Sequence, residues 1–402
     1  MKKLIRFPLK TVYSAVLLAL SPVPVYAVST GGCDNYIPTT GQTVTCTPSI
    51  TPAATNGVQT ATNSGNNNVT VNVNSGTVLS FQGSPIGIGS ASTVTNAGTL
   101  NSGTFNYGYG ISFGANGRSG AGGNTVTNTA GGVIQTAGAD AAGIYVNAPN
   151  ATAAVNSITN NGSIATTGSG DSFGIKLINR NNTDAISNSG SISSATTYGI
   201  YVNGSANITS SGAISGATTA IYFDPATANT RADTLTLQSG ATISGAIAFN
   251  TTKTSETLVF DGLTNANFNN TLTGANIIKA INGASVTMNS AAGYAFGAGQ
   301  MNVDRTSSLT ISGVILDGAI ATSLTKTGAG TLSLSGINTY TGTTDVQAGA
   351  LVLTGSVTSN TTVASGATLQ GGGTINGSLT NAGNIQPATG SVRTTLTVTG
   401  NY

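Results

Sequence analysis

LTKTGAGTLSLSGINTYTGTTDVQAGALVL, from Leu324 to Leu353, contains the same short pattern of leucines twice. Leu332 and Leu334 occupy alternate positions of one segment and Leu351 and Leu353 those of another, with one equal offset in the numbering between the two pairs (351 − 332 and 353 − 334). Alternation with a period of two is typical of a β-strand with one buried face. The equal offset predicts that the two strands lie one above the other in consecutive turns of a repeat.

The same organisation extends upstream. Five segments each combine a β-branched residue, a polar residue, Asn or Ser, Gly and, after a polar gap, a short apolar run around one isoleucine. The isoleucines are Ile111, Ile144, Ile175, Ile200 and Ile221, so their spacing shortens along the chain (144 − 111, 175 − 144, 200 − 175 and 221 − 200). Fixed anchors with variable spacing predict strands that keep their position and loops of unequal length.

Stacking is the physical solution for such units, because one unit cannot bury its few apolar side chains alone. We therefore predict an all-β fold, a right-handed parallel β-helix, in which isoleucine lies over isoleucine in a narrow core. The Asn and Gly residues of the units are expected in turns that need positive φ. Neutral Thr and Ser outside avoid the repulsion of identical charges stacked about every 4.8 Å. Frequent Gly and Thr disfavour helices.

The composition excludes several kinds of catalytic site. Of the 402 residues only 6% are charged, and there is no His. Without His, neither a Ser-His-Asp triad nor an HExxH zinc site can be built. Asp171-Ser172 lies in a GDS triplet that resembles an esterase nucleophile block, but that chemistry also needs a His base. A carboxylate pair such as Asp171 with Asp184 could converge across turns, with solvated loop acids as the alternative. We predict no catalytic residue, no metal site and no cofactor.

Residues 1–27 are expected to be a cleaved signal peptide. MKKLIRFPLK carries four basic residues and no acidic one, and a short apolar core follows. About 10 apolar residues are too few for a membrane anchor, which needs about 20. Small residues predict cleavage between Ala27 and Val28. The remaining chain has 9 basic residues (13 − 4) and 11 acidic ones. No electrostatic footprint for nucleic acid is left, so no nucleic-acid partner is predicted.

Cys33 and Cys46 are the only cysteines of the chain. Export to an oxidising compartment favours a disulfide between them. Two free thiols or a metal pair are the alternatives, although two cysteines without His make a poor metal site. We therefore divide the chain into a signal peptide over 1–27, an N-terminal cap with the first turns over 28–75, irregular β-helix repeats over 76–323, and a further repeat region over 324–402.

The stretch from Thr325 to Leu351 resembles the autotransporter-associated β-strand repeat of Gram-negative bacteria. GATLQGGGTINGSLTNAGNIQP, from Gly366 to Pro387, resembles the last passenger turns of that family. The resemblance implies a passenger domain that is exported through the Sec machinery and the periplasm and is exposed at the outer surface. It also implies an outer-membrane translocator barrel as partner. No barrel pattern follows in this sequence, so the chain is expected to be the front part of a longer autotransporter or a truncated product.

Two classes of function remain open. The first is a structural and adhesive surface rod that contacts host or bacterial surface molecules through its loops. The second is a carbohydrate-binding or carbohydrate-cleaving β-helix. Tyrosines that recur beside the isoleucine anchors could form a ladder that stacks on sugars, with internal aromatic packing as the alternative. The predicted ladder residues are Tyr109, Tyr145, Tyr201 and Tyr222.

Overall fold

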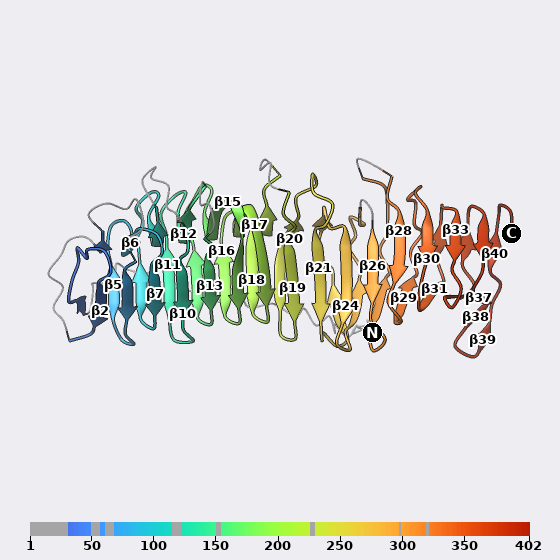
Figure 1. The fold of residues 1–402 in the computed structure, drawn as a ribbon, viewed down its shortest axis with the longest axis horizontal. Helices are drawn as coiled ribbons and strands as arrows, with labels where there is room; N and C mark the ends of the chain where they lie inside the picture. Colours follow the sequence, from blue (N-terminus) through green and yellow to red (C-terminus); the bar gives the residue numbers. More distant parts are fainter. Residues whose placement is uncertain are drawn as a thin grey trace, which may run out of the picture.

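The computed structural model describes residues 31–49, 57–60, 68–114, 122–149, 154–225, 230–296, 299–318 and 321–402. In this part the chain forms a long rod of short strands stacked along one axis, with the sequence advancing from one end of the rod to the other (Figure 1). The all-β parallel β-helix predicted from the sequence is confirmed. No helix of the described part is long and apolar enough to cross a membrane. The predicted signal peptide and its cleavage site, Ala27 and Val28, lie outside the described residues.

One column of parallel strands runs along almost the whole rod, each strand paired with its equivalent one turn later. The length of a turn varies, from the short step between Thr344 and Thr361 to the long one between Thr93 and Thr125. The members of the column are β2 (Thr43–Thr47), β4 (Thr70–Val73), β7 (Thr93–Asn96), β10 (Thr125–Asn128), β13 (Ser157–Asn160), β19 (Thr234–Gln238), β21 (Thr257–Asp261), β24 (Ile277–Ile281), β26 (Gln300–Val303), β28 (Leu324–Thr327), β30 (Thr344–Val346), β33 (Thr361–Val363) and β36 (Leu379–Asn381).

A second group of strands follows the first column along the chain. In the first half of the rod it contains β5 (Val78–Ser80), β8 (Thr99–Asn101), β11 (Val133–Thr136), β14 (Ser163–Thr166) and β16 (Ser191–Ser194). In the second half a separate seven-stranded sheet contains β22 (Ala266–Phe268), β25 (Ser285–Met288), β27 (Ser308–Ile311), β29 (Thr331–Leu334), β31 (Ala350–Leu353), β34 (Thr368–Gln370) and β37 (Asn384–Gln386).

A third column contains β3 (Val58–Gln59), β6 (Ile86–Ile88), β9 (Tyr109–Phe113) and β12 (Ala142–Asn147). Four long strands in the middle of the rod bend and take part in two columns each: β15 (Phe173–Asn188), β17 (Tyr198–Ser210), β18 (Ala213–Phe223) and β20 (Thr242–Ala248). Short strands complete the rod: β1 (Gly32–Cys33), β23 (Leu272–Thr273), β32 (Ser356–Val357), β35 (Thr374–Ile375), β38 (Ala388–Thr389), β39 (Val392–Arg393) and β40 (Thr397–Val398).

The isoleucine anchors stack as predicted. Parallel pairing places each of the five isoleucines directly opposite the next one, and all five are 0% exposed. Pairing extends this stack to Ile86 before and Ile247 after it. Burial of one such side chain contributes about 1.5–3 kcal/mol, so the stack is a main source of stability in the first half of the rod.

The two leucine pairs between Leu324 and Leu353 also stack. Leu332 of β29 lies opposite Leu351 of β31, and Leu334 lies opposite Leu353. All four side chains are at most 1% exposed. The equal offset between the two pairs is therefore one turn of the solenoid.

The asparagines of the repeat units do not have the predicted positive φ. Asn96, Asn128, Asn160 and Asn188 are instead buried and form a ladder inside the rod. Each amide nitrogen donates a hydrogen bond to the side-chain oxygen one turn later, at 2.8–2.9 Å, and Asn188 donates to Ser210 at 3.1 Å. The prediction was wrong because an amide carries both a donor and an acceptor, so stacked amides can satisfy one another without water.

The glycines that follow these asparagines are also needed for a reason other than positive φ. A Cβ on Gly162 would lie 2.2 Å from the carbonyl oxygen of Gly132 in the turn before. At Gly190, and at Gly212 after Ser210, the corresponding distances to the preceding turn's glycine carbonyl are 2.0 and 2.1 Å. Successive turns approach so closely at this corner that only glycine fits.

The N-terminal end of the described part is closed by a covalent link. Cys33 and Cys46 form a disulfide with an Sγ–Sγ distance of 2.04 Å. It joins β1 to β2, which pair antiparallel, whereas β2 pairs parallel with β4. This arrangement is consistent with a cap; the proposed domain boundaries themselves remain predictions.

Candidate functional site

The predicted tyrosines lie on the outer surface of the third column. Because side chains alternate across a strand, the residue after each buried isoleucine points outward. Strand pairing therefore places Tyr145, Lys176, Tyr201 and Tyr222 in one outward row, each opposite the next. Tyr109 lies two residues before Ile111 and belongs to the neighbouring row. In this row Ala142 pairs with Tyr109 on one side and with Phe173 on the other.

The rings of these residues touch across successive turns. Tyr109 and Tyr145 have ring centroids 4.5 Å apart, and Tyr201 and Tyr222 are stacked at 5.8 Å. Tyr198 contacts both Tyr222 and Tyr201, with ring centroids 5.1 and 5.7 Å apart. The four predicted residues therefore belong to one surface, which we call the aromatic face. It consists of the half-buried Tyr109, Tyr145, Lys176, Tyr198, Tyr201 and Tyr222, which pack around Phe173, a side chain only 4% exposed.

Lys176 is the cation of the aromatic face. Its Nζ lies 4.3 Å from the ring centroid of Phe173, and at 5.8 and 5.7 Å from those of Tyr145 and Tyr201. Such contacts are favourable because the ring face carries negative charge. Desolvation lowers the pKa of this lysine, while Asp171 acts in the opposite direction. Lys176 was not predicted from the sequence, although its place directly after Ile175 was a usable signal.

The tyrosines are half-buried, so each exposes part of its ring while the rest packs on its neighbours. Burial, followed by the neighbouring Tyr145, raises the pKa of Tyr109 to about 12. Burial also raises the pKa of Tyr201, whose hydroxyl donates a hydrogen bond to Asp224. Asn203 donates to the same carboxylate oxygen at 2.7 Å. Tyr109 and Tyr201 are therefore neutral at physiological pH and offer apolar faces with polar tips.

The two acids considered for a carboxylate pair lie in different environments. Asp184 is 1% exposed inside the rod, where Asn156 and Asn179 donate hydrogen bonds to its Oδ1. Asp171 is exposed in the turn before β15, and its backbone N–H donates to Asp140. One is in the core and the other is in solvent, so they do not form a shared acid-base site. Within the described ranges, no group of three or more His, Cys, Asp or Glu side chains is placed to hold a metal ion.

Comparison with known proteins gives one match. Residues 324–353, which contain the stacked leucine pairs, match the family described as the passenger-associated-transport-repeat. This segment is an autotransporter passenger repeat. Repeats of this kind imply export to the cell surface or the extracellular space and, in general, an outer-membrane translocator as partner. Neither a curated protein nor a solved structure matches the chain.

The passenger repeat contains a buried cation that was not predicted from the sequence. Lys326 in β28 is 0% exposed. Its Nζ donates hydrogen bonds to the carbonyl oxygens of Thr327, Gly328 and Ala348 at 2.8, 2.7 and 3.0 Å. Burial lowers its pKa to about 8. The lysine thus ties a corner of one turn to the next, which is a structural use of its three donors.

Proposed function

We propose that this chain is the adhesive rod of an autotransporter and that the aromatic face binds carbohydrate at a cell surface. The observation that supports the proposal is two groups of half-buried tyrosines in contact, Tyr109 with Tyr145 and Tyr198 with Tyr201 and Tyr222, with Lys176 Nζ between Tyr145 and Tyr201. Sugar rings stack on such faces through their C–H groups, because these are weakly polar and the aromatic face is negative. Hydroxyl and carboxylate groups beside the rings, such as those of Tyr201 and Asp224, can exchange hydrogen bonds with sugar hydroxyls.

The proposal has no catalytic component. Asp224, a carboxylate in contact with the aromatic face, is held by hydrogen bonds from Tyr201 and Asn203. Glycoside hydrolysis generally needs a pair of carboxyl groups, one on each side of the scissile bond. We therefore expect binding without turnover.

A glycan array probed with the purified chain tests the proposal. We expect binding to a subset of oligosaccharides, and Tyr145→Ala and Tyr201→Ala should each weaken it by up to about tenfold, which corresponds to the usual contribution of one aromatic contact. Tyr402→Ala is a matched control, since Tyr402 is 81% exposed and is remote in sequence from the aromatic face. Protease resistance of each variant must match that of the unsubstituted chain.

Three results would contradict parts of this proposal. Release of shortened oligosaccharides would make the chain an enzyme, as in the second class of function. Equal loss of binding in Tyr402→Ala and Tyr201→Ala would place the binding surface elsewhere. No binding to any glycan, together with adhesion of the displayed rod to protein-coated surfaces, would leave an adhesive rod with a different ligand.

A further inference from the structure

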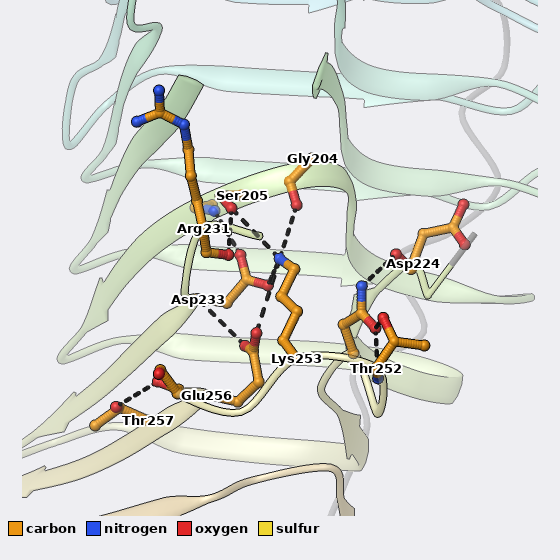
Figure 2. Close-up of polar contacts among 12 residues, drawn as sticks. Gly204, Ser205, Asp224, Arg231, Asp233, Thr252, Lys253, Glu256 and Thr257 are labelled. Atoms are coloured by element: carbon orange, nitrogen blue, oxygen red, sulfur yellow. Dashed lines mark hydrogen bonds and ion pairs between the residues drawn. The ribbon is translucent and has the colours of Figure 1, made fainter. Parts of the chain in front are cut away.

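A lysine and two carboxyl groups meet inside the rod (Figure 2). Lys253 Nζ lies 2.6 Å from Oδ2 of Asp233 and 3.7 Å from Oε1 of Glu256. Both acids are 0% exposed and the lysine is 7% exposed. Buried charges are costly unless they are paired, and here one cation faces two acids. Glu256 Oε1 has no hydrogen-bond partner in the described structure.

Strand register brings the three residues together. Asp233 directly precedes β19 and Glu256 directly precedes β21, and these strands pair with Thr234 opposite Thr257. The two acids therefore lie in adjacent turns, and Glu256 Oε2 accepts a hydrogen bond from the Asp233 backbone N–H at 3.1 Å. Lys253 lies in the loop between β20 and β21, and its side chain extends to both acids (Figure 2).

The two acids occupy places that amides occupy elsewhere. In this internal polar column, one side-chain oxygen accepts the backbone N–H of a residue in the preceding turn, at 2.8–3.3 Å. Its members are Asn124, Asn156, Asp184, Asp233, Glu256 and Asn276. An amide carbonyl is sufficient for this hydrogen bond, and it avoids the desolvation of a charge. Conversion of the Asp233 carboxylate to an amide would therefore suit the column.

We propose that Lys253 and Asp233 form an intramolecular isopeptide bond, with Glu256 as the acid-base residue. A C–O bond of about 1.2 Å places Cγ of Asp233 within about 3.8 Å of the lysine nitrogen, since Oδ2 is at 2.6 Å. When reacting groups are held this close in a dry site, proximity alone lowers the activation barrier substantially. The backbone N–H of Ala206 donates to Oδ1 at 2.8 Å, so it polarises the carbonyl that remains after reaction.

The reaction balances with the three side chains alone. Glu256 gives its proton to Asp233, and the Lys253 ammonium returns one to Glu256. The neutral amine then attacks Cγ, the N–C bond forms, the Cγ–Oδ2 bond breaks, and Oδ2 leaves as water with a proton relayed from nitrogen by Glu256. The products are an amide, one water molecule and a protonated Glu256. Neither an oxidant nor any other co-reactant is needed.

The environment gives Glu256 the protonation state that this role requires. Burial, followed by repulsion from Asp233, raises the pKa of Glu256 to about 9. The raised pKa favours the protonated acid, which is the form that gives the first proton to Asp233. Gly204 O, at 3.2 Å from Lys253 Nζ, is available to accept the remaining N–H of the amide.

Trypsin digestion of the purified, folded full chain tests the proposal. Trypsin cuts after Arg231, Lys253 and Lys279 in this region. A free Lys253 gives two peptides, 232–253 and 254–279. The isopeptide bond blocks the cut, so we expect one peptide, 232–279, whose mass is lower than calculated by one water. Backbone fragment ions between Asp233 and Lys253 should be missing from its spectrum. Two separate peptides at full mass, without the linked one, would overturn the proposal.

Variants separate the link from other losses of water. Lys253→Arg should restore cleavage and full mass, whereas dehydration of Asp233 on its own would persist in this variant and overturn the assignment. Asp233→Asn should still form the link, now with loss of ammonia, because Asn is accommodated elsewhere in the internal polar column. Glu256→Gln keeps the shape but removes the proton relay, so the linked fraction should fall at least tenfold. An unchanged linked fraction would remove Glu256 from the reaction.

Discussion

Replacing Asp184 by asparagine should stabilise the middle of the rod at neutral pH, and this gain should be absent in acid. Desolvation by burial raises the pKa of Asp184 from 3.8 to about 6, against the opposing hydrogen bonds from Asn156 and Asn179. The folded state therefore holds a proton that the unfolded chain has already released. Below the unfolded pKa the carboxyl is protonated in both states and costs nothing. Stability is lost as the pH rises from about 4 to 6, and the loss is complete above the folded pKa.

The size of the effect follows from the shift. About 2 pKa units correspond to about 3 kcal/mol of destabilisation by the ionised carboxylate. The substituted amide keeps the oxygen that accepts from Asn156, but its nitrogen replaces Oδ2 of Asp184, which has no hydrogen-bond partner in the described structure. An unpaired buried donor costs about 1 kcal/mol. The net expectation is a stabilisation of about 2 kcal/mol near pH 8 and a destabilisation of up to about 1 kcal/mol in acid, where only the cost of the unpaired amide donor remains.

Native-state hydrogen exchange is the suitable assay, because a solenoid opens locally and its turns need not unfold in one step. The probes are the backbone amides of Asn156 and Ala185, which donate in this part of the rod. Opening free energies of Asp184→Asn and the unsubstituted chain should diverge as the pH is raised. A variant that is less stable near pH 8 would refute the reasoning, because the carboxylate would then be a favourable charge.

Three further perturbations have defined outcomes. Ile200→Asp places an unpaired charge in the isoleucine stack and should cost several kcal/mol locally; an unchanged protease digestion pattern would contradict the importance of the stack. Cys46→Ser should loosen β1 and β2 without unfolding the distal turns, and labelling of both cysteines in the native exported protein would exclude the disulfide. Lys326 has a folded pKa of about 8 against 10.5, so the turns around it should gain stability as the pH rises from about 8 to 10. Lys326→Met should lack this gain in denaturant titrations, and a gain equal to that of the unsubstituted chain would assign it to another group.

The sequence was sufficient for the strands and their stacking. Ile144, Ile175 and Ile200 recur within similar local patterns, and the pairing of strands one turn apart follows because no other arrangement buries one isoleucine per unit. The outward direction of Tyr145 could also have been predicted, since it follows a buried isoleucine in a strand. Turn propensity alone predicts turns for Asn96 and its equivalents, whereas their recurrence at the same place in successive units is the signal that indicates a stacked ladder.

The contacts around Lys253 could not be predicted from the sequence. The contacts of this lysine with Asp233 and Glu256 depend on the register of β19 with β21 and on the path of the loop before Glu256. Local sequence pattern determines neither. The aromatic face was predictable in part, because its tyrosines recur beside the anchors, while Phe173 and Lys176 replace tyrosine and break the visible pattern.

The asparagine ladder has the chemistry of an amyloid spine within a single chain. Cross-β fibrils stack identical amides from many molecules, and their strands can add in any register that aligns equal side chains. Here the rungs from Asn96 to Asn188 are joined within one chain by two connections of equal length and a shorter last one, with sequence separations of 32, 32 and 28. A slip by one rung would have to place the shorter last connection on a longer one. Irregular loops thus fix the order of the rungs, so a ladder that is self-complementary at every level has only one way to assemble.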